Sequence, residues 1–292
     1  MIKSHAKINL SLTVLGKINS NFHRIETIVS FISLHDEIYI KNINKKKHKI
    51  LFYGKFSKGI PSSNTVSTLM KFMDKQNLLN GKKYSIKIKK NIPQKAGLGG
   101  GSMNAASIIR FFLLKRDKII SKNKIFELSE KVGSDVKFGL KLNNTIQLGN
   151  QSIFRFKKKI GLYVVIVKPN FGCSTKSIYK KVRIFSKPNL NNTFIKNINL
   201  NKIKILKNDL ENVAKNEYPK LENLINFMKN LKHNEFVRMT GSGSAAIAYF
   251  KTKNASLNAT KVIKKKYKNY WCIISKTIYS FFFVLYEINF GV

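Results

Sequence analysis

The residues of this 292-residue chain best suited to chemistry form a glycine run, Gly97-Leu98-Gly99-Gly100-Gly101-Ser102. Four glycines in five positions let the backbone approach a ligand closely and turn its N–H groups inward. A strongly apolar segment, residues 103–115, follows directly and is typical of a helix. The start of a helix adds unpaired N–H groups and a positive dipole end. The spacing therefore predicts an anion site for phosphates, with a plain flexible turn as the alternative.

Two common nucleotide motifs do not fit the chain. The P-loop pattern needs a Lys and then Ser or Thr after its last glycine, and none stands in register here. The dinucleotide fingerprint fails in the glycine run because Ser102 occupies its third glycine position. A second match, Gly241-x-Gly243-x-x-Ala246, leads into a predicted strand instead of a helix, so it is a weak signal.

The elements that position these residues follow from the spacing of apolar side chains. Alternating or continuous apolar runs predict strands at residues 8–14, 25–40 (with a polar break at 35–37), 84–89, 162–167 and 245–250. Helices are expected at residues 66–76, 103–115, 121–132, 210–214 and 221–231, and a loop at 185–201. On the first strand, Lys7 and Asn9 share the face opposite the apolar set. This order indicates an α+β fold, with domains at 1–155 and 156–292.

Charge and composition bound the class of protein. The chain carries 55 Lys and Arg against 14 Asp and Glu, a net charge of +41, which first suggests a nucleic-acid-binding protein. Only six of the basic residues are Arg, the side chain that base and bidentate phosphate recognition favour, and the Lys residues are spread along the whole chain. Compositional drift, with the Lys side chains in solvent, explains the high net charge better than nucleic-acid binding does. The positive field still favours small anionic substrates.

Several other classes are excluded. Two cysteines, Cys173 and Cys272, rule out a disulfide scaffold, and no His or Cys spacing suits zinc, so no metal-ligating residue is proposed. The most apolar segment, residues 278–286, is far shorter than the roughly 20 residues of a membrane-spanning helix. No signal peptide is evident, and we expect a cytoplasmic protein without a nucleic-acid or membrane partner.

Four ordered motifs resemble those of the GHMP kinase superfamily, whose phosphate loop reads P-x-x-x-G-L-G-[SG]-[SG]. Here that loop is Pro93-x-x-x-Gly97-Leu98-Gly99-Gly100-Gly101. Three segments are similar to the 4-diphosphocytidyl-2-C-methyl-D-erythritol kinases within it: A-K-I-N-L at 6–10, G-S-D-V at 133–136 and R-M-T-G-S-G at 238–243. Phe22-His23 resembles part of a further motif of that family, and the resemblance extends to about residue 280.

The resemblance implies a two-domain GHMP kinase fold, with an N-terminal ribosomal-protein-S5-domain-2-like domain and a C-terminal ferredoxin-like α/β domain. It also implies ATP- and Mg²⁺-dependent phosphorylation of the 2-hydroxyl of 4-diphosphocytidyl-2-C-methyl-D-erythritol, in non-mevalonate isoprenoid precursor biosynthesis. By the same resemblance Lys7 and Asp135 are the catalytic pair. A carboxylate can take the proton of a poorly nucleophilic alcohol, and a nearby ammonium keeps it ionised. Outside these motifs, Lys7 would be a solvated strand end and Asp135 a turn or helix-cap residue.

The binding residues are also carried over by resemblance. The ATP-binding set is the loop, Pro93, Gln94, Lys95, Ala96, Gly97, Leu98, Gly99, Gly100, Gly101, Ser102 and Met103. The substrate-binding set is Asn9, Phe22, His23, Thr175, Tyr179, Gly241, Ser242 and Gly243. In the family, aromatic side chains at the positions of Phe22 and Tyr179 sandwich the cytosine; ordinary core packing is the alternative for both.

The chain departs from the family pattern at several positions. Met103 replaces a small residue after the loop, and Lys137 stands where the family usually has Pro, either adding charge near Asp135 or facing solvent. Residues 281–292 have no recognisable family counterpart. Two alternatives remain: a GHMP kinase for another small alcohol, such as homoserine or mevalonate, and the more remote nucleic-acid-binding protein. The sequence does not predict an oligomeric state.

Overall fold

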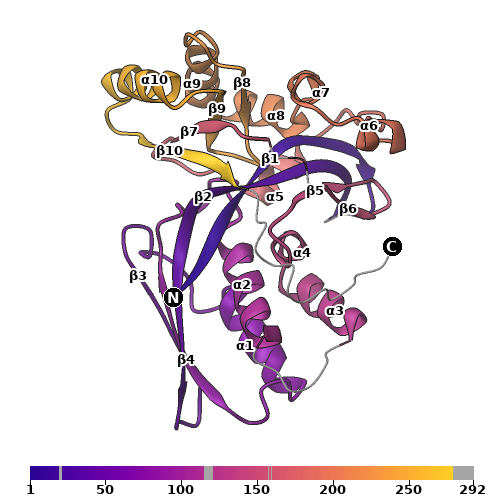
Figure 1. Cartoon of the computed structure of the whole chain (residues 1–292), viewed down its shortest axis with the longest axis vertical. Helices are drawn as coiled ribbons and strands as arrows, with labels where there is room; N and C mark the ends of the chain where they lie inside the picture. The colour runs from indigo at the N-terminus through magenta and orange to yellow at the C-terminus, as the bar shows by residue number, and fades with distance from the viewer. Residues whose placement is uncertain (20–21, 115–120, 157, 159, 279–292) are drawn as a thin grey trace.

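The computed structural model describes residues 1–19, 22–114, 121–156, 158 and 160–278 (Figure 1). Its strands are β1 (Ile2–Lys17), β2 (His23–Ile43), β3 (Lys49–Tyr53), β4 (Lys83–Lys89), β5 (Asn144–Gln147), β6 (Ile153–Phe156), β7 (Tyr163–Lys168), β8 (Phe236–Met239), β9 (Ala246–Phe250) and β10 (Trp271–Ile278). Its helices are α1 (Thr65–Lys75), α2 (Gly100–Leu114), α3 (Lys122–Val132), α4 (Val136–Gly139), α5 (Thr175–Lys180), α6 (Asn192–Lys196), α7 (Leu200–Ile205), α8 (Asp209–Glu217), α9 (Pro219–Lys229) and α10 (Lys253–Lys266). None of the helices in these described ranges is long and apolar enough to cross a membrane.

The described strands join into one sheet that passes through both halves of the molecule. Its order is β3-β4-β2-β10-β7-β9-β8, while β1 and β5 also pair with β2, and β6 pairs with β5. The described ladders are antiparallel except the parallel pair β3–β4. Mostly antiparallel strands with separate groups of helices confirm the α+β prediction.

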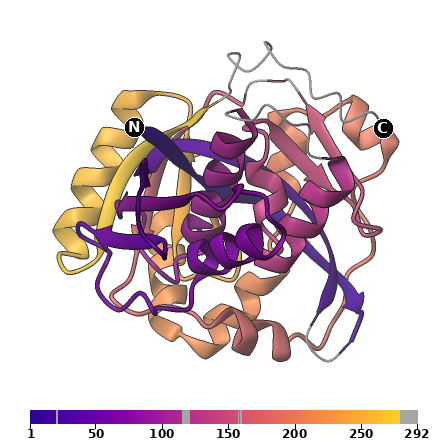
Figure 2. The same cartoon turned by 90° about the horizontal axis from the view of Figure 1, so that it is seen from below.

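Hydrophobic cores lie on both sides of this sheet. In the first half, α1, α2 and α3 pack against β2 and β4, and in the second half α8, α9 and α10 pack against β7 and β9. Seen from below, the purple and magenta helices of the first half lie together in the middle of the view (Figure 2). A further core joins the halves, because Ile8 and Ile28 from the first pack with Ile166 and Ile247 from the second. The predicted domain boundary at residue 155 stays a prediction.

The long strands β1 and β2 run side by side (Figure 1), and β1 carries Lys7 and Asn9. Their pairing shifts register between His5 and Lys7 and again between Asn9 and Ser11, so irregularities flank the segment that carries Lys7 and Asn9. Such irregularities re-aim side chains and increase the local twist. Ala6, Ile8 and Leu10 of β1 enter the shared core, whereas Lys7 and Asn9 face away from it, as their alternation predicts.

The expected strands and the expected helices are present, with shifted ends. The helix expected from residue 103 begins at Gly100, so two of the loop glycines form its first turn. The loop expected at 185–201 is wrong, because it contains α6 and the start of α7. Both helices are short, and the side chains of Asn191 and Asn199 cap them. Residue 115 and the segment 281–292 lie outside the described residues.

The polar residues 35–37 do not break the second strand, because β2 continues through them. Asp36 is fully buried and forms an ion pair with Lys90. Its other oxygen accepts hydrogen bonds from the backbone N–H groups of Asn91 and Ile92, at 2.7 and 2.9 Å. This carboxylate therefore anchors the chain at the point where it leaves β4 for the glycine run.

We predict that Asp36→Asn lowers the free energy of unfolding by about 3–5 kcal/mol, because it leaves the buried Lys90 ammonium without its counter-charge. The measurement is urea unfolding of the purified protein followed by circular dichroism. The matched control is Glu37→Gln, next in sequence, whose partner Lys89 has a half-exposed side chain. The control should shift the midpoint far less, and equal shifts for both variants would contradict the assignment.

Candidate active site

The glycine run forms a loop that requires glycine at positions 97 and 99. Lys95, Gly97 and Gly99 have positive φ angles of 50°, 72° and 67°. A Cβ on Gly97 would lie 1.9 Å from the carbonyl oxygen of Thr240, and one on Gly99 would lie 2.7 Å from Cγ of Lys7. The loop thus packs directly against two other segments and opens onto the N-terminus of α2, whose first N–H groups have no partner inside the helix.

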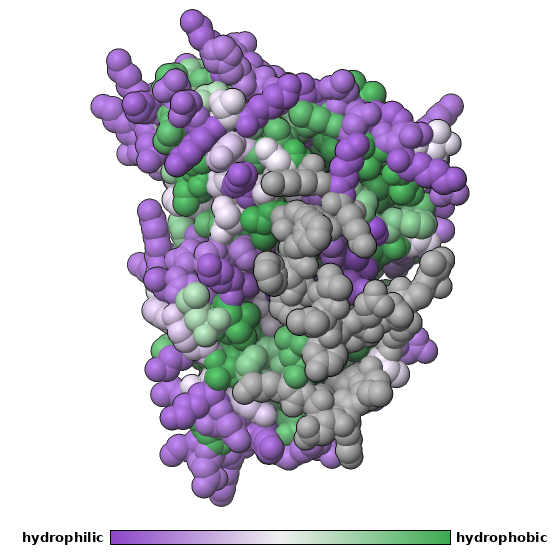
Figure 3. All heavy atoms as spheres, in the orientation of Figure 1, coloured by the Kyte–Doolittle hydropathy of each residue, from purple (hydrophilic) through white to green (hydrophobic). Residues whose placement is uncertain are grey.

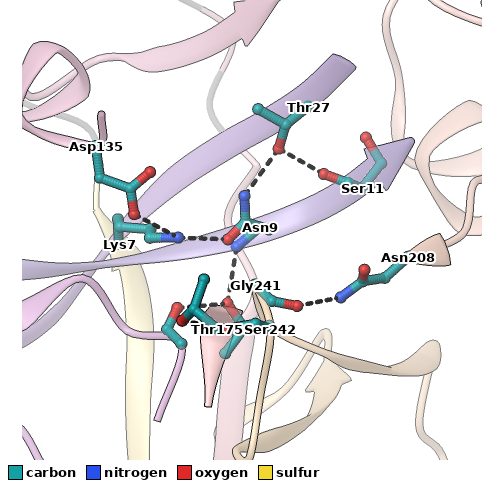
Figure 4. Close-up of polar contacts among 11 residues, drawn as sticks. Lys7, Asn9, Ser11, Thr27, Asp135, Thr175, Asn208, Gly241 and Ser242 are labelled. Atoms are coloured by element: carbon teal, nitrogen blue, oxygen red, sulfur yellow. Dashed lines mark hydrogen bonds and ion pairs between the residues drawn. The ribbon is translucent and has the colours of Figure 1, made fainter. Parts of the chain in front are cut away.

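Lys7 and Asp135 meet beside this loop. Nζ of Lys7 lies 3.1 Å from Oδ2 of Asp135 and 2.6 Å from Oδ1 of Asn9 (Figure 4). The Lys7 side chain is 4% exposed and that of Asp135 is 34% exposed. Asp135 occupies the N-cap position of α4 but makes no capping bond with its side chain. The carboxylate is therefore held by a buried ammonium and keeps access to a ligand.

Asn9 is itself held in one orientation. Its Nδ2 donates to Oγ1 of Thr27 at 2.8 Å, and that hydroxyl donates to the carbonyl of Ser11 at 2.6 Å (Figure 4). Because the Thr27 hydroxyl gives its proton to Ser11, it accepts from Asn9, and the Asn9 carbonyl oxygen must face Lys7. The amide thus orients the Lys7 ammonium.

The second half of the chain supplies a turn that faces the loop. Oγ1 of Thr240 accepts from the backbone N–H of Asn9 at 3.0 Å and donates to the carbonyl of Gly97 at 3.2 Å. Next in the turn, the hydroxyl of Ser242 lies 2.8 Å from that of Thr175, the first residue of α5 (Figure 4). The turn, the loop and β1 therefore meet at one place.

A cavity of about 410 Å³ lies between these segments. Of the sequence-predicted residues, those that line it are Lys7, Asn9, Pro93, Gln94, Lys95, Ala96, Gly97, Leu98, Gly99, Gly100, Gly101, Ser102, Asp135, Thr175, Tyr179, Gly241, Ser242 and Gly243. Sequence reasoning missed further lining residues, among them Thr27, Thr65, Lys90 and Phe138. Thr65 follows the helix-capping Asn64, a local signal that predicts a helix start but not a ligand contact.

Three predicted residues lie outside this lining. Met103 packs into a small core with Val29, Phe31 and Phe138, and its N–H donates to the carbonyl of Gly99. This N–H group is therefore not available to donate a hydrogen bond to a phosphate, which corrects the expectation that Met103 supplies such a donor. Phe22 is 62% exposed, and His23 lies behind Tyr179 rather than on the cavity wall.

The rings of His23 and Tyr179 are 5.1 Å apart, with Phe185 at 6.4 Å from His23. Burial and the charge of Asp135 raise the pKa of Tyr179, so its phenol stays neutral. Both ring nitrogens of His23 are inaccessible to water and make no hydrogen bond to the described residues. Burial and the charge of Lys17 lower the pKa of His23. Of this cluster, Tyr179 presents a neutral aromatic ring to the cavity, and His23 packs against that ring.

The charged residues among the described lining residues are Lys7, Lys90, Lys95 and Asp135. Lys7 is paired with Asp135 and Lys90 with the buried Asp36, so Lys95 carries the ammonium that no carboxylate of the described residues pairs with. Lys137 is 8% exposed, so the alternative that it faces solvent is wrong, and burial lowers the pKa of its ammonium. The Lys95 ammonium and the backbone N–H groups at the loop and at the start of α2 suit an anionic ligand such as a polyphosphate.

Comparisons with known proteins agree with this geometry. The family profile "GHMP kinases N terminal domain" matches residues 64–142, and "GHMP kinases C terminal" matches residues 188–269. A curated relative, the 4-diphosphocytidyl-2-C-methyl-D-erythritol kinase of Pelagibacter ubique, is 51% identical over 277 residues, which covers 95% of this chain and 98% of the relative.

Solved structures share the fold. A crystal structure of a 4-(cytidine 5'-diphospho)-2C-methyl-D-erythritol kinase superposes with a TM-score of 0.72 at 22% identity, covering 94% of this chain and 98% of the other. Homoserine kinase from Cytophaga hutchinsonii gives 0.67 at 12% identity, with 94% of each chain covered. The two-domain fold expected from the motifs is thereby confirmed, and at these identities the likeness speaks for the fold alone.

We predict that Gly97→Ala destroys the contact between the loop and Thr240, because the new Cβ would overlap a backbone oxygen at a positive φ. The free energy of unfolding should fall by more than about 1 kcal/mol, and ATP binding, measured by calorimetry, should be lost. Gly16→Ala, around whose Cβ position no atom lies within 4 Å, is the control and should change neither quantity. Normal ATP affinity in Gly97→Ala would show that the loop does not form the nucleotide site.

Proposed function

The chain belongs to the family of 4-diphosphocytidyl-2-C-methyl-D-erythritol kinases within the GHMP kinases, and from that premise we propose how its residues perform the reaction. The reaction is the ATP-dependent phosphorylation of the 2-hydroxyl of 4-diphosphocytidyl-2-C-methyl-D-erythritol in the non-mevalonate formation of isoprenoid precursors. The single observation that carries the mechanism is the Lys7–Asp135 pair, 3.1 Å apart beside the glycine loop.

Asp135 is the general base. Its carboxylate takes the proton of the substrate 2-hydroxyl as that oxygen attacks the γ-phosphorus of ATP. The bond between the γ-phosphorus and the bridging oxygen breaks, and ADP leaves with that electron pair. Lys7 holds the carboxylate in place and offsets the negative charge that develops on the substrate oxygen. Asn9 fixes the direction of the ammonium.

The loop residues Pro93–Ser102 cradle the phosphates of ATP. Glycine at positions 97 and 99 lets the loop pack against Thr240 and Lys7, and the loop residues line the cavity in which the phosphates bind. Mg²⁺ prefers oxygen ligands and is commonly held by one or two side chains together with phosphate oxygens. The Ser102 hydroxyl lines the cavity at the phosphate loop and offers such an oxygen, so it would hold the ion together with the phosphates, and the ion would neutralise phosphate charge.

The cytidine end of the substrate binds at the second half. Tyr179 lies on the cavity wall with His23 behind it, which supports Tyr179 as one face of the base clamp. Phe22 remains the proposed second face, and its 62% exposure leaves its ring open to contact a ligand. Thr175, Gly241, Ser242 and Gly243 contact the substrate, and the Asn9 carbonyl oxygen has a second lone pair for a polyol hydroxyl.

The two alternative functions receive less support. Homoserine kinase shares the fold, so the fold does not choose between small-alcohol kinases, whereas the relative with 51% identity favours the cytidine substrate. Against nucleic-acid binding, hydrophilic side chains are spread over both halves of the visible face and do not gather in one patch (Figure 3). The expected cytoplasmic location stays a prediction.

The test of the function is ADP release from ATP in the presence of single alcohols. The purified protein should release ADP with 4-diphosphocytidyl-2-C-methyl-D-erythritol and not with homoserine, mevalonate or unmodified methylerythritol. ³¹P NMR should then show a new phosphomonoester on the consumed substrate. Turnover of homoserine or mevalonate in place of the cytidine derivative would contradict the proposal.

We predict that Asp135→Asn reduces kcat by about 10²–10⁴-fold, because the side chain keeps its shape but can no longer take a proton. Binding of ATP and of the cytidine substrate, measured by calorimetry, should change little. The matched control is Asp74→Asn, which alters a carboxylate outside the cavity that is also paired with a lysine, Lys83, and is 31% exposed. Full activity in Asp135→Asn would show that the reaction needs no base at this position and that Asp135 is a turn or helix-cap residue.

We also predict that Tyr179→Ala weakens binding of the cytidine substrate by roughly 1–3 kcal/mol, the usual contribution of one base–aromatic stack. The KM for ATP should stay unchanged. Tyr270→Ala, which removes a partly buried ring that does not line this cavity, serves as the control. Equal weakening of both ligands in Tyr179→Ala would indicate core damage and overturn the clamp.

A further inference from the structure

Asn208 lies behind the active site and makes an unusually complete set of hydrogen bonds. It is 5% exposed, and its Nδ2 donates to the carbonyl oxygens of Met239 and Gly241, at 2.8 Å each (Figure 4 shows the second). Its Oδ1 accepts from the N–H of Leu210 at 3.1 Å, which caps α8. Both amide hydrogens are therefore committed to one short segment of backbone.

The two carbonyls that Asn208 holds stand on either side of Thr240. The Thr240 hydroxyl bonds to the backbone N–H of Asn9 and to the carbonyl of Gly97. Asn9 in turn orients the Lys7 ammonium at 2.6 Å. A chain of direct contacts thus runs from Asn208 through the turn to β1 and to the phosphate loop.

The residues next to Asn208 connect β1 to β8 through hydrogen bonds. The backbone N–H of Val14 in β1 donates to Asp209 at 2.8 Å, and that of Met239 in β8 donates to Glu211 at 2.8 Å. The N–H of Leu12 donates to the carbonyl of Lys207 at 3.0 Å. Residues 207–211 therefore bridge β1 and β8, and Asn208 reaches furthest toward the site. It does not line the cavity, so it cannot act on a ligand directly.

We propose that Asn208 is a positioning residue for the reaction: its amide holds the turn at Thr240–Gly241 in the place where Thr240 meets Asn9 and Gly97. The inference rests on the proposed function, because the effect is expressed in that reaction. Loss of the amide donors leaves two carbonyl oxygens buried without a partner, and the turn shifts to satisfy them. Displacements near 1 Å at reacting groups reduce rates strongly.

The test uses two substitutions that retain the helix cap. Asp and Ser are both good N-cap residues, so both variants keep the bond from Leu210. Asn208→Asp removes both amide donors, and Asn208→Ser leaves a single hydroxyl hydrogen for the two carbonyl oxygens. Asn191→Asp makes the same chemical change at the exposed N-cap of α6 and is the control. The full-length variants are compared by kcat, corrected for the folded fraction measured by circular dichroism. The KM for ATP and the KM for the cytidine substrate are compared as well.

We expect kcat/KM for the cytidine substrate to fall about tenfold or more in both Asn208 variants, with kcat per folded molecule reduced, and to stay unchanged in Asn191→Asp. A normal kcat per folded molecule together with normal KM values would overturn the proposal, even if both variants unfold more easily, because the role of Asn208 would then be structural only. A defect in Asn208→Asp with a normal Asn208→Ser would also overturn it, since a buried charge would be the cause. If the wild type itself failed to phosphorylate the cytidine derivative, the proposed function would fall, and this inference with it.

Discussion

The ion pair between the Lys7 ammonium and the Asp135 carboxylate is the interaction on which the rest of the site depends. An ammonium as deeply buried as that of Lys7 is stable only with oxygen partners in hydrogen-bond reach, and Asp135 and Asn9 supply them. The shifts in register of β1 on either side of this segment aim both side chains at one place. The glycine at position 99 leaves room for the stem of Lys7, so the pair and the loop occupy adjoining space.

The same constraint explains why the site needs both halves of the chain. The turn of the second half touches β1 through Asn9 and touches the loop through Gly97, at separations of 231 and 143 residues in sequence. A core shared by β1, β2, β7 and β9 holds these segments at fixed spacing. The nucleotide and the cytidine substrate would then meet where the halves meet, with the acid–base pair between them.

Sequence reasoning reached the local features and missed those that depend on distant partners. The glycine run, the alternation of Lys7 and Asn9 and the motif around Asp135 are visible in a few adjacent residues, and the structure brings all three together. Asp36 looked like a break in a strand, because its partner Lys90 is 54 residues away. Met103 belonged to the loop by position, yet its side chain enters a core formed with Val29 and Phe138. No sequence pattern predicts the role of Asn208, because its amide donates to backbone carbonyl oxygens 31 and 33 residues away.

A double-mutant cycle on kcat tests the central claim, that Lys7 and Asp135 act as one unit on one proton. The cycle compares the wild type with Lys7→Ala, Asp135→Asn and the double variant, all saturated with ATP and the cytidine substrate. Residues that act as a unit give strongly non-additive losses. If Lys7 and Asp135 act as one unit, the double variant is about as slow as the slower single variant. A loss equal to the product of the two single losses would show that the two residues work independently, and the shared role would be excluded.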